Sequence, residues 1–141
     1  MRSLLLLLLP PLLAGCVNES ASYSIAGNDH SLTLMVTQDY FWSKQAGVRL
    51  VASRLPDCQR QIDLGRAPLA DLNVELFTTG EDKFLLRSGD DMWQVETGTC
   101  SQLPPPSGDV QAQPIGVFHF DAKKKLVFEP AEAATAPSAA Q

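Results

Sequence analysis

The strongest constraint on the fold is a series of short, strand-like segments separated by turn sequences. From Ser31 to Phe41 the apolar side chains of Leu32, Leu34 and Val36 take alternate positions. This period of two is typical of a strand with one buried face. Further strands are expected at 23–25, 48–55, 60–64, 73–79, 83–87, 92–97, 115–121 and 125–129. Short strands at such regular spacing, with hardly any helical pattern, predict a single all-β domain.

The connections between these segments predict antiparallel pairing. Gly80-Glu81-Asp82 and Ser88-Gly89-Asp90-Asp91 are short and contain turn-forming residues, which suits hairpins. The segment from Leu103 to Gly108 contains three consecutive prolines, so we expect an extended surface loop there. The stretch 66–72 is ambiguous, and it could hold a helical turn at 68–71, because proline is tolerated at a first helical position. The sequence therefore predicts either a small antiparallel barrel or a two-sheet sandwich, and does not separate these two architectures.

The predicted core follows from the inward positions of these strands. A register error of one residue would exchange the two faces of any strand. The expected core residues are Leu32, Leu34, Val36, Leu50, Val74, Leu76, Phe84, Leu86, Trp93, Val95, Phe118, Phe120 and Val127.

The N-terminus has the layout of a secretory signal peptide. Arg2 is followed by an apolar run from Leu4 to Leu13 and by small residues. The run is about half as long as a membrane-spanning helix requires. The stretch Leu13-Ala14-Gly15-Cys16 resembles the lipobox of bacterial lipoprotein precursors. That resemblance implies cleavage before Cys16 and acylation of its sulfur and its new amine; the alternative is a free thiol beside an ordinary cleavage site.

This reading predicts the organisation of the whole chain. Residues 1–15 are expected to be the signal peptide, 16–22 a lipidated tether and 23–130 the β domain. Residues 131–141 contain no large apolar side chain, so we expect a disordered tail. Val17, in place of an aspartate after the lipidated cysteine, resembles lipoproteins sent on to the outer membrane.

Cys58 and Cys100 are the cysteines that remain once Cys16 is assigned to lipid. In a chain exported to an oxidising compartment, such a pair predicts one disulfide. Metal binding with His30 and His119 is a weaker alternative, because none of the four has the close spacing of a zinc site. Redox chemistry is also less favoured, because a dithiol oxidoreductase normally has its cysteines at C-x-x-C spacing. No metal or other cofactor is expected.

The charge of the chain limits its partners. Loss of Arg2 with the signal peptide changes the net charge from −5 to −6. A nucleic-acid-binding protein of this size would need a basic face, so no nucleic-acid partner is expected. Acyl chains on Cys16 would have to hold the protein at the membrane, and two or more chains are enough for stable anchoring.

Four clusters have both a functional and a structural interpretation. Tyr40-Phe41-Trp42 could stack on a sugar ring or a partner's proline, although core packing plus edge cover is favoured. His30 and His119 each have a carboxylate nearby and could move protons, but no nucleophile motif accompanies them. Lys123-Lys124-Lys125 could contact phosphates, although a solvated hairpin tip is favoured. The two acidic turns lack the spacing of a calcium loop.

A second resemblance covers most of residues 23–121. Tyr40-Phe41-Trp42, Arg54 to Arg60, Val74 to Phe77 and Trp93 to Cys100 look similar to segments of small uncharacterised lipoproteins of Gram-negative bacteria. The resemblance implies an anchored β domain and brings no activity with it. We therefore expect a lipid-anchored protein of the cell envelope, facing the periplasm. It would be a binding or structural module without catalysis that contacts an envelope protein or glycan; the alternative is a periplasmic hydrolase using a His-carboxylate pair.

Overall fold

The computed structural model describes residues 16–131, and within that range the chain forms ten strands and no helix. The signal peptide predicted at 1–15 and all but the first residue of the predicted tail lie outside the described residues. The strands are β1 (Asn18–Ala26), β2 (His30–Thr37), β3 (Gln45–Arg54), β4 (Cys58–Pro68), β5 (Asn73–Gly80), β6 (Lys83–Ser88), β7 (Asp91–Glu96), β8 (Ser101–Leu103), β9 (Gln113–Phe120) and β10 (Leu126–Pro130).

The first four strands form an antiparallel meander in the order β1-β2-β3-β4. The alternation along β2 buries Leu32, Leu34 and Val36 completely, with Leu50 of β3 directly opposite Leu34. Most side chains on the other face of β2 and β3 are half-buried or exposed, as expected for an antiparallel sheet covered on one side. Sequence alternation therefore decides which face of this sheet meets the core.

The other strands form a six-stranded antiparallel sheet in the order β10-β9-β5-β6-β7-β8. Strands β5 to β8 follow one another through short turns, and β9 returns beside β5. The connection from β8 to β9 contains the three prolines and runs outside the ladder, as predicted. It passes over the outer face of this sheet, which explains why three successive residues of β6, Phe84 to Leu86, are all buried.

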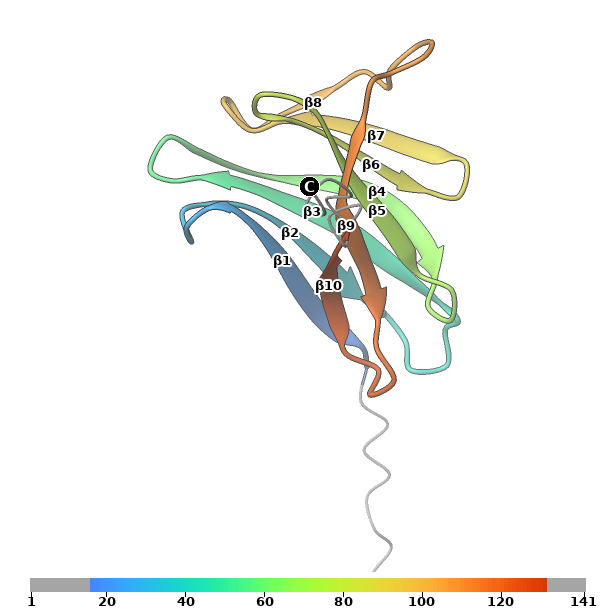
Figure 1. The fold of residues 1–141 in the computed structure, drawn as a ribbon. Helices are drawn as coiled ribbons and strands as arrows, with labels where there is room; N and C mark the ends of the chain where they lie inside the picture. Colours follow the sequence, from blue (N-terminus) through green and yellow to red (C-terminus); the bar gives the residue numbers. More distant parts are fainter. Residues whose placement is uncertain (1–15, 132–141) are drawn as a thin grey trace, which may run out of the picture.

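The two sheets pack face to face around one apolar core, so the fold is an all-β two-sheet sandwich (Figure 1). The edge strands β1 and β10 meet through Tyr23 and Phe128, whose ring centroids are 5.2 Å apart. Within residues 16–131 these edges are joined by side chains rather than by a hydrogen-bonded ladder. Of the two architectures predicted, the structure therefore has the sandwich.

The tether predicted at 16–22 is wrong over most of its length, because β1 begins at Asn18. Glu19, Ala21, Tyr23 and Ile25 are half-buried and alternate with exposed residues, so the segment is a strand with a weakly apolar inner face. Pairing with β2 satisfies the backbone groups on one side of this edge strand, although its serines and alanines gave little strand signal. The β domain accordingly begins almost directly after Cys16.

Most of the predicted core is confirmed, with one error of register. Trp93 and Phe120 are half-buried against the core, whereas Val127 points to the outer face of β10. Its neighbours Leu126 and Phe128 take the inward positions. A strand of five residues with apolar side chains at three successive positions does not reveal its inner face.

The stretch around Pro68 contains no helical turn. β4 runs as far as Pro68, well beyond the strand expected at 60–64, and a turn then leads to β5. Pro68 lies at the end of an edge strand, a position that tolerates a residue without a backbone donor.

Candidate functional site

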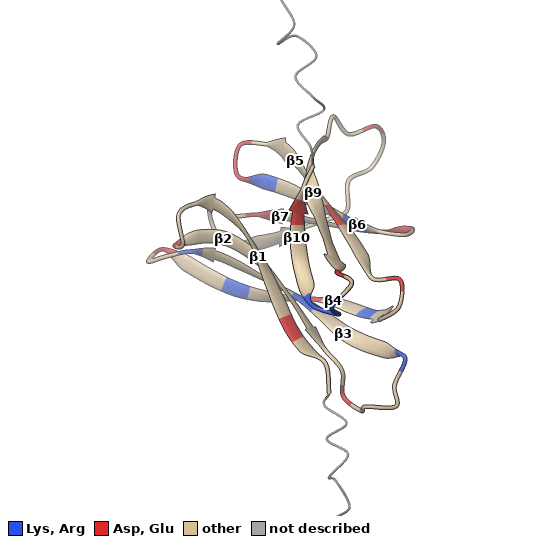
Figure 2. Ribbon diagram, turned by 60° about the horizontal axis from the view of Figure 1, so that its bottom comes forward, with Lys and Arg blue, Asp and Glu red and all other residues tan. Residues whose placement is uncertain are grey.

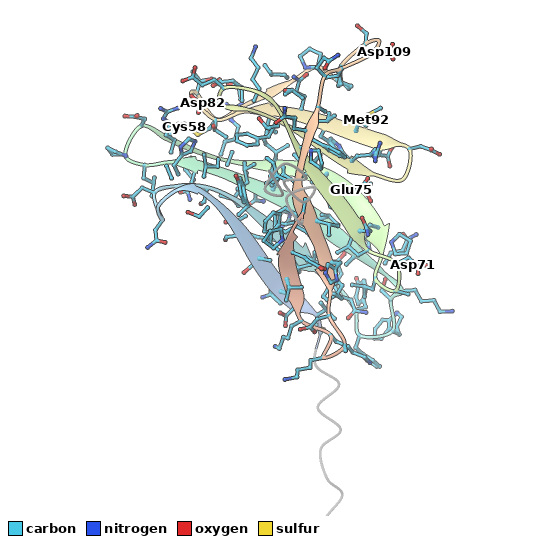
Figure 3. All side chains as sticks on the ribbon, viewed as in Figure 1. Cys58, Asp71, Glu75, Asp82, Met92 and Asp109 are labelled. Atoms are coloured by element: carbon cyan, nitrogen blue, oxygen red, sulfur yellow. A yellow bond between two sulfur atoms is a disulfide. The ribbon has the colours of Figure 1, made fainter. Side chains whose placement is uncertain are left out.

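One end of the sandwich is closed by a disulfide, as predicted from the cysteine count. Cys58, the first residue of β4, is bonded to Cys100 in the turn between β7 and β8, with the Cα atoms 5.9 Å apart. Cys100 is fully buried. The bond joins the two sheets, and Figure 3 shows Cys58 at this end of the molecule, near Asp82.

A polar cluster beside the disulfide joins the sheets a second time. Arg54 at the end of β3 donates through Nη1 to Asp82 Oδ2 at 2.8 Å, across to the β5–β6 turn. This hydrogen bond, together with the charge of Asp82, raises the pKa of Arg54. His30 Nε2 and Thr97 Oγ1 lie 2.9 Å apart in a second hydrogen bond between the sheets. The acidic turn at Asp82 is thus part of the contact between the sheets.

The geometry of this cluster differs from that of a nucleophilic triad. A catalytic histidine uses one ring nitrogen for the nucleophile and the other for the carboxylate. Here Nε2 of His30 faces both Thr97 Oγ1 at 2.9 Å and Asp82 Oδ1 at 4.0 Å. Thr97 is also completely buried, so its hydroxyl is closed to a substrate. The arrangement supports the packing of the two sheets and offers no support for a hydrolase at His30.

Glu96 organises the turn that carries Cys100. Its carboxylate accepts hydrogen bonds from Thr99 Oγ1 at 2.7 Å, from Thr99 N at 3.1 Å and from Gly98 N. The bond from the Thr99 hydroxyl is the largest of the effects that lower the pKa of Glu96, while partial desolvation opposes them. A lowered folded-state pKa stabilises the fold above the unfolded value, and the gain is lost as pH falls through the folded pKa.

We therefore expect Thr99→Val to raise the pKa of Glu96 and to move acid unfolding to higher pH. The conservative variant Thr99→Ser keeps a hydroxyl and should leave both quantities nearly unchanged. Carboxyl NMR titration of Glu96, with urea unfolding at neutral and acidic pH, measures the two effects. An unchanged Glu96 titration in Thr99→Val would show that the hydroxyl bond does not control this carboxylate.

His119 lies on the outer face of β9, near the other end of the molecule. Its Nε2 is 2.8 Å from Glu129 Oε2 on the neighbouring β10, and its Nδ1 faces the carbonyl oxygen of Phe120. The Glu129 side chain is largely exposed. Asp121, the carboxylate nearest to His119 in the sequence, does not pair with it; Asp121 Oδ1 accepts hydrogen bonds from the backbone N–H groups of Lys123 and Lys125 in the turn.

The end opposite the disulfide carries Cys16, and we call it the anchor end after the lipid attachment that the sequence predicts for this residue. Cys16 is exposed and is the free cysteine of residues 16–131. Val17 follows it and is held by Gln38, which donates from its backbone N to Val17 O at 2.8 Å and accepts from Val17 N through Oε1 at 3.2 Å. In Figure 1 the beginning of β1 lies at the bottom, near the β9–β10 turn and the β2–β3 loop.

A broad cavity of about 640 Å³ opens at the anchor end, between the two sheets. The side chains of Val17, Leu69 and Phe120 contribute apolar surface to it, and Lys44 and Lys124 contribute cationic groups. Most of its lining comes from the ends of β2, β4 and β9 and the loops that follow them. These three strands come from both sheets, so the cavity forms where the two sheets come together at this end.

The aromatic triplet Tyr40-Phe41-Trp42 also lies at the anchor end, and its predicted burial is wrong. The three side chains are 56%, 58% and 66% exposed. They pack on one another, with the Tyr40 and Trp42 rings stacked at 5.0 Å and Phe41 edge-on to Trp42 at 4.8 Å. β2 ends at Thr37, so the triplet lies in a loop, where the alternation of a strand no longer directs side chains inward.

A second surface lies on the outer face of the six-stranded sheet. The guanidinium of Arg87 is 5.1 Å from the Phe77 ring centroid, and its Nε donates to Glu75 at 2.7 Å. A groove of about 200 Å³ separates Phe77 and Arg87 from the proline-containing loop. Met92 lines this groove and is exposed; Figure 3 shows it on the same side of the molecule as Asp109.

Comparison with known proteins gave no match to a protein-family model, to a curated protein or to a solved structure. Among residues 16–131, no group of three His, Cys, Asp or Glu side chains is placed to hold a metal ion. The same residues contain no helix of the length and hydropathy needed to cross a bilayer.

Proposed function

We propose that this protein is a lipid-anchored module of the bacterial cell envelope, held in the membrane by acyl chains on Cys16 and facing the periplasm. The observation that carries the proposal is the position of Cys16: it is exposed and unbridged, directly in front of the first strand, while Cys58 and Cys100 are bonded to each other. The lipobox-like residues before Cys16 supply the route to acylation. Val17 favours the outer membrane over the inner.

The short distance from Cys16 to the sandwich limits the orientation of the domain relative to the membrane. Only Val17 separates Cys16 from β1, and Val17 is itself hydrogen-bonded to Gln38. A chain reaches at most about 3.6 Å per residue, so the acyl chains would hold the anchor end close to the lipid surface. The disulfide end and the outer face of the six-stranded sheet would then point into the periplasm.

The role we propose for the domain is binding or structural, with an envelope protein or glycan as its partner. The groove lined by Phe77, Met92 and the proline-containing loop combines apolar surface with the charged groups of Arg87 and Asp109, which suits contact with either class of partner. The histidine clusters favour this role over the hydrolase alternative, because His30 is engaged between the sheets and His119 forms a surface pair with Glu129.

Replacing Cys16 with serine should abolish anchoring, because serine supplies no thiol for the first acylation. We expect wild-type protein in the membrane fraction, with a mature N-terminus at Cys16 and the added mass of acyl chains. The variant should remain as an uncut precursor or appear as an unacylated product. Membrane fractionation with intact-protein mass spectrometry measures both.

Cys58→Ser/Cys100→Ser is the matched control, since it removes thiols at the other end of the molecule and should leave acylation of Cys16 in place. A wild-type chain that begins at another residue, or that carries no acyl mass, would refute the proposed anchor.

A further inference from the structure

We infer that the Tyr40-Phe41-Trp42 loop inserts into the headgroup region of the same phospholipid bilayer that holds Cys16, so that the bilayer covers the anchor end. The inference rests on the anchoring proposed above. It assigns a second membrane contact, made by side chains, that fixes the orientation of the sandwich relative to the lipid surface.

The position of the loop is fixed by Gln38, which is buried. Its backbone and side chain bind both polar backbone groups of Val17, as described above. Its side-chain Nε2 also donates to the carbonyl oxygens of Phe41 and Ser43. One buried side chain therefore ties the aromatic loop to the residue that follows Cys16, and a bilayer that holds Cys16 must lie beside this loop.

The chemistry of the loop suits the interface between water and lipid. Three adjacent aromatic side chains are more than half exposed, although burial of such rings would be strongly favourable. Tyrosine and tryptophan are enriched at the level of lipid headgroups, where the ring meets hydrocarbon and the polar group meets water. A contiguous exposed apolar surface of this kind marks a contact site.

The cavity at the anchor end adds a second apolar surface in the same direction. Leu69 and Phe120 line it, and Lys44 and Lys124 lie at its margin. Figure 2 shows basic and acidic residues interspersed along the strands and loops of the sandwich. At the anchor end, two cations are neutralised by the ion pairs Arg66–Asp39 and Lys125–Glu19. Within residues 16–131, Lys44, Lys123 and Lys124 form no ion pair and remain available to lipid phosphates.

The test uses Trp42 as a probe of depth. The chain contains two tryptophans, Trp42 in the loop and Trp93 half-buried in β7, so the difference between wild type and Trp42→Phe reports Trp42 alone. Trp42 is exposed, and the variant should therefore fold like the wild type. The acylated protein is reconstituted in phosphatidylethanolamine–phosphatidylglycerol vesicles, with or without bromine on the acyl chains.

We expect brominated lipid to reduce the Trp42 emission at least twofold and the emission of Trp42→Phe by much less. Vesicle-bound protein whose Trp42 is quenched no more than Trp93 would overturn the inference. A Trp42 that stays open to iodide on vesicles, and becomes shielded only when envelope proteins are added, would assign the loop to a protein partner and overturn it as well.

Failure of the anchor and failure of the insertion give different results. The mass of the same sample shows whether Cys16 is acylated. Acylated, vesicle-bound protein with unquenched Trp42 overturns the insertion and leaves the anchor intact. If the chain proves unacylated, quenching of Trp42 by added vesicles still supports insertion, and its absence overturns it.

Discussion

Replacing both Cys58 and Cys100 with serine is expected to lower the free energy of unfolding by about 2 to 5 kcal/mol. The disulfide spans a sequence separation of 42 residues, and in the chain-entropy account a loop of that size is worth roughly 4 kcal/mol. Small domains have total stabilities of about 5 to 15 kcal/mol, so the loss is a large fraction of the whole. Urea unfolding of the oxidised wild type and the double variant measures it.

The matched control is Cys16→Ser in the same assay. Cys16 is exposed and lies outside the strands, so its replacement should leave the unfolding curve of the domain unchanged. Thiol labelling without reductant should find no reactive thiol at Cys58 or Cys100 in the folded protein. Labelling of both residues, or equal stability of the double variant and the wild type, would mean that the bridge does not stabilise the fold.

The second large effect is expected for Phe118→Ala, which should lower the free energy of unfolding by about 3 to 5 kcal/mol. Phe118 is fully buried in β9, and its ring centroid lies 4.8 Å from that of Phe128 on β10. Removing the ring loses the transfer free energy of its buried atoms and leaves a cavity between the two sheets, because the surrounding side chains relax only partly. Chemical unfolding monitored by far-UV circular dichroism measures the change.

Phe41→Ala removes the same atoms from the anchor-end loop, where Phe41 is 58% exposed. This substitution should change the free energy of unfolding by no more than about 0.5 kcal/mol, as most surface substitutions do. A loss for Phe41→Ala comparable to that for Phe118→Ala would show that the aromatic loop is part of the core, and would count against a role in membrane contact.

In our proposal the two ends of the sandwich have different roles, one in stability and one in membrane contact. The disulfide end holds the sheets together through Cys58–Cys100, Arg54–Asp82 and His30–Thr97. The anchor end carries Cys16, an exposed aromatic loop and an apolar cavity. The covalent bond and the side-chain hydrogen bonds that link the two sheets lie at the first end, whereas the aromatic side chains at the second stay exposed, which in our proposal leaves them free for contact with lipid.

The amino-acid sequence by itself determined the all-β class, most strand positions and the central core. Alternation in β2 identified Leu32, Leu34 and Val36, because a strand covered on one side must place apolar residues at every second position. The Cys58–Cys100 pairing followed from the expectation that the chain is exported and that Cys16 is acylated, and the structure confirms the bond itself. Alternation is a local signal, and the number of cysteines can be counted in the sequence. Neither requires knowing which strands become neighbours.

Only the tertiary structure decided which weakly patterned segments join the sheets and which side chains from distant strands meet. β1 is a strand because β2 offers an open edge to pair with, although serines and alanine give its sequence little strand character. Val127 faces outward because its pairing with His119 sets the register of β10. His30 and Thr97 are 67 positions apart, and the aromatic loop meets Val17 through Gln38. Contacts of this kind depend on how the two sheets stack. The stacking is determined by packing over the whole core, so no short stretch of sequence reveals it.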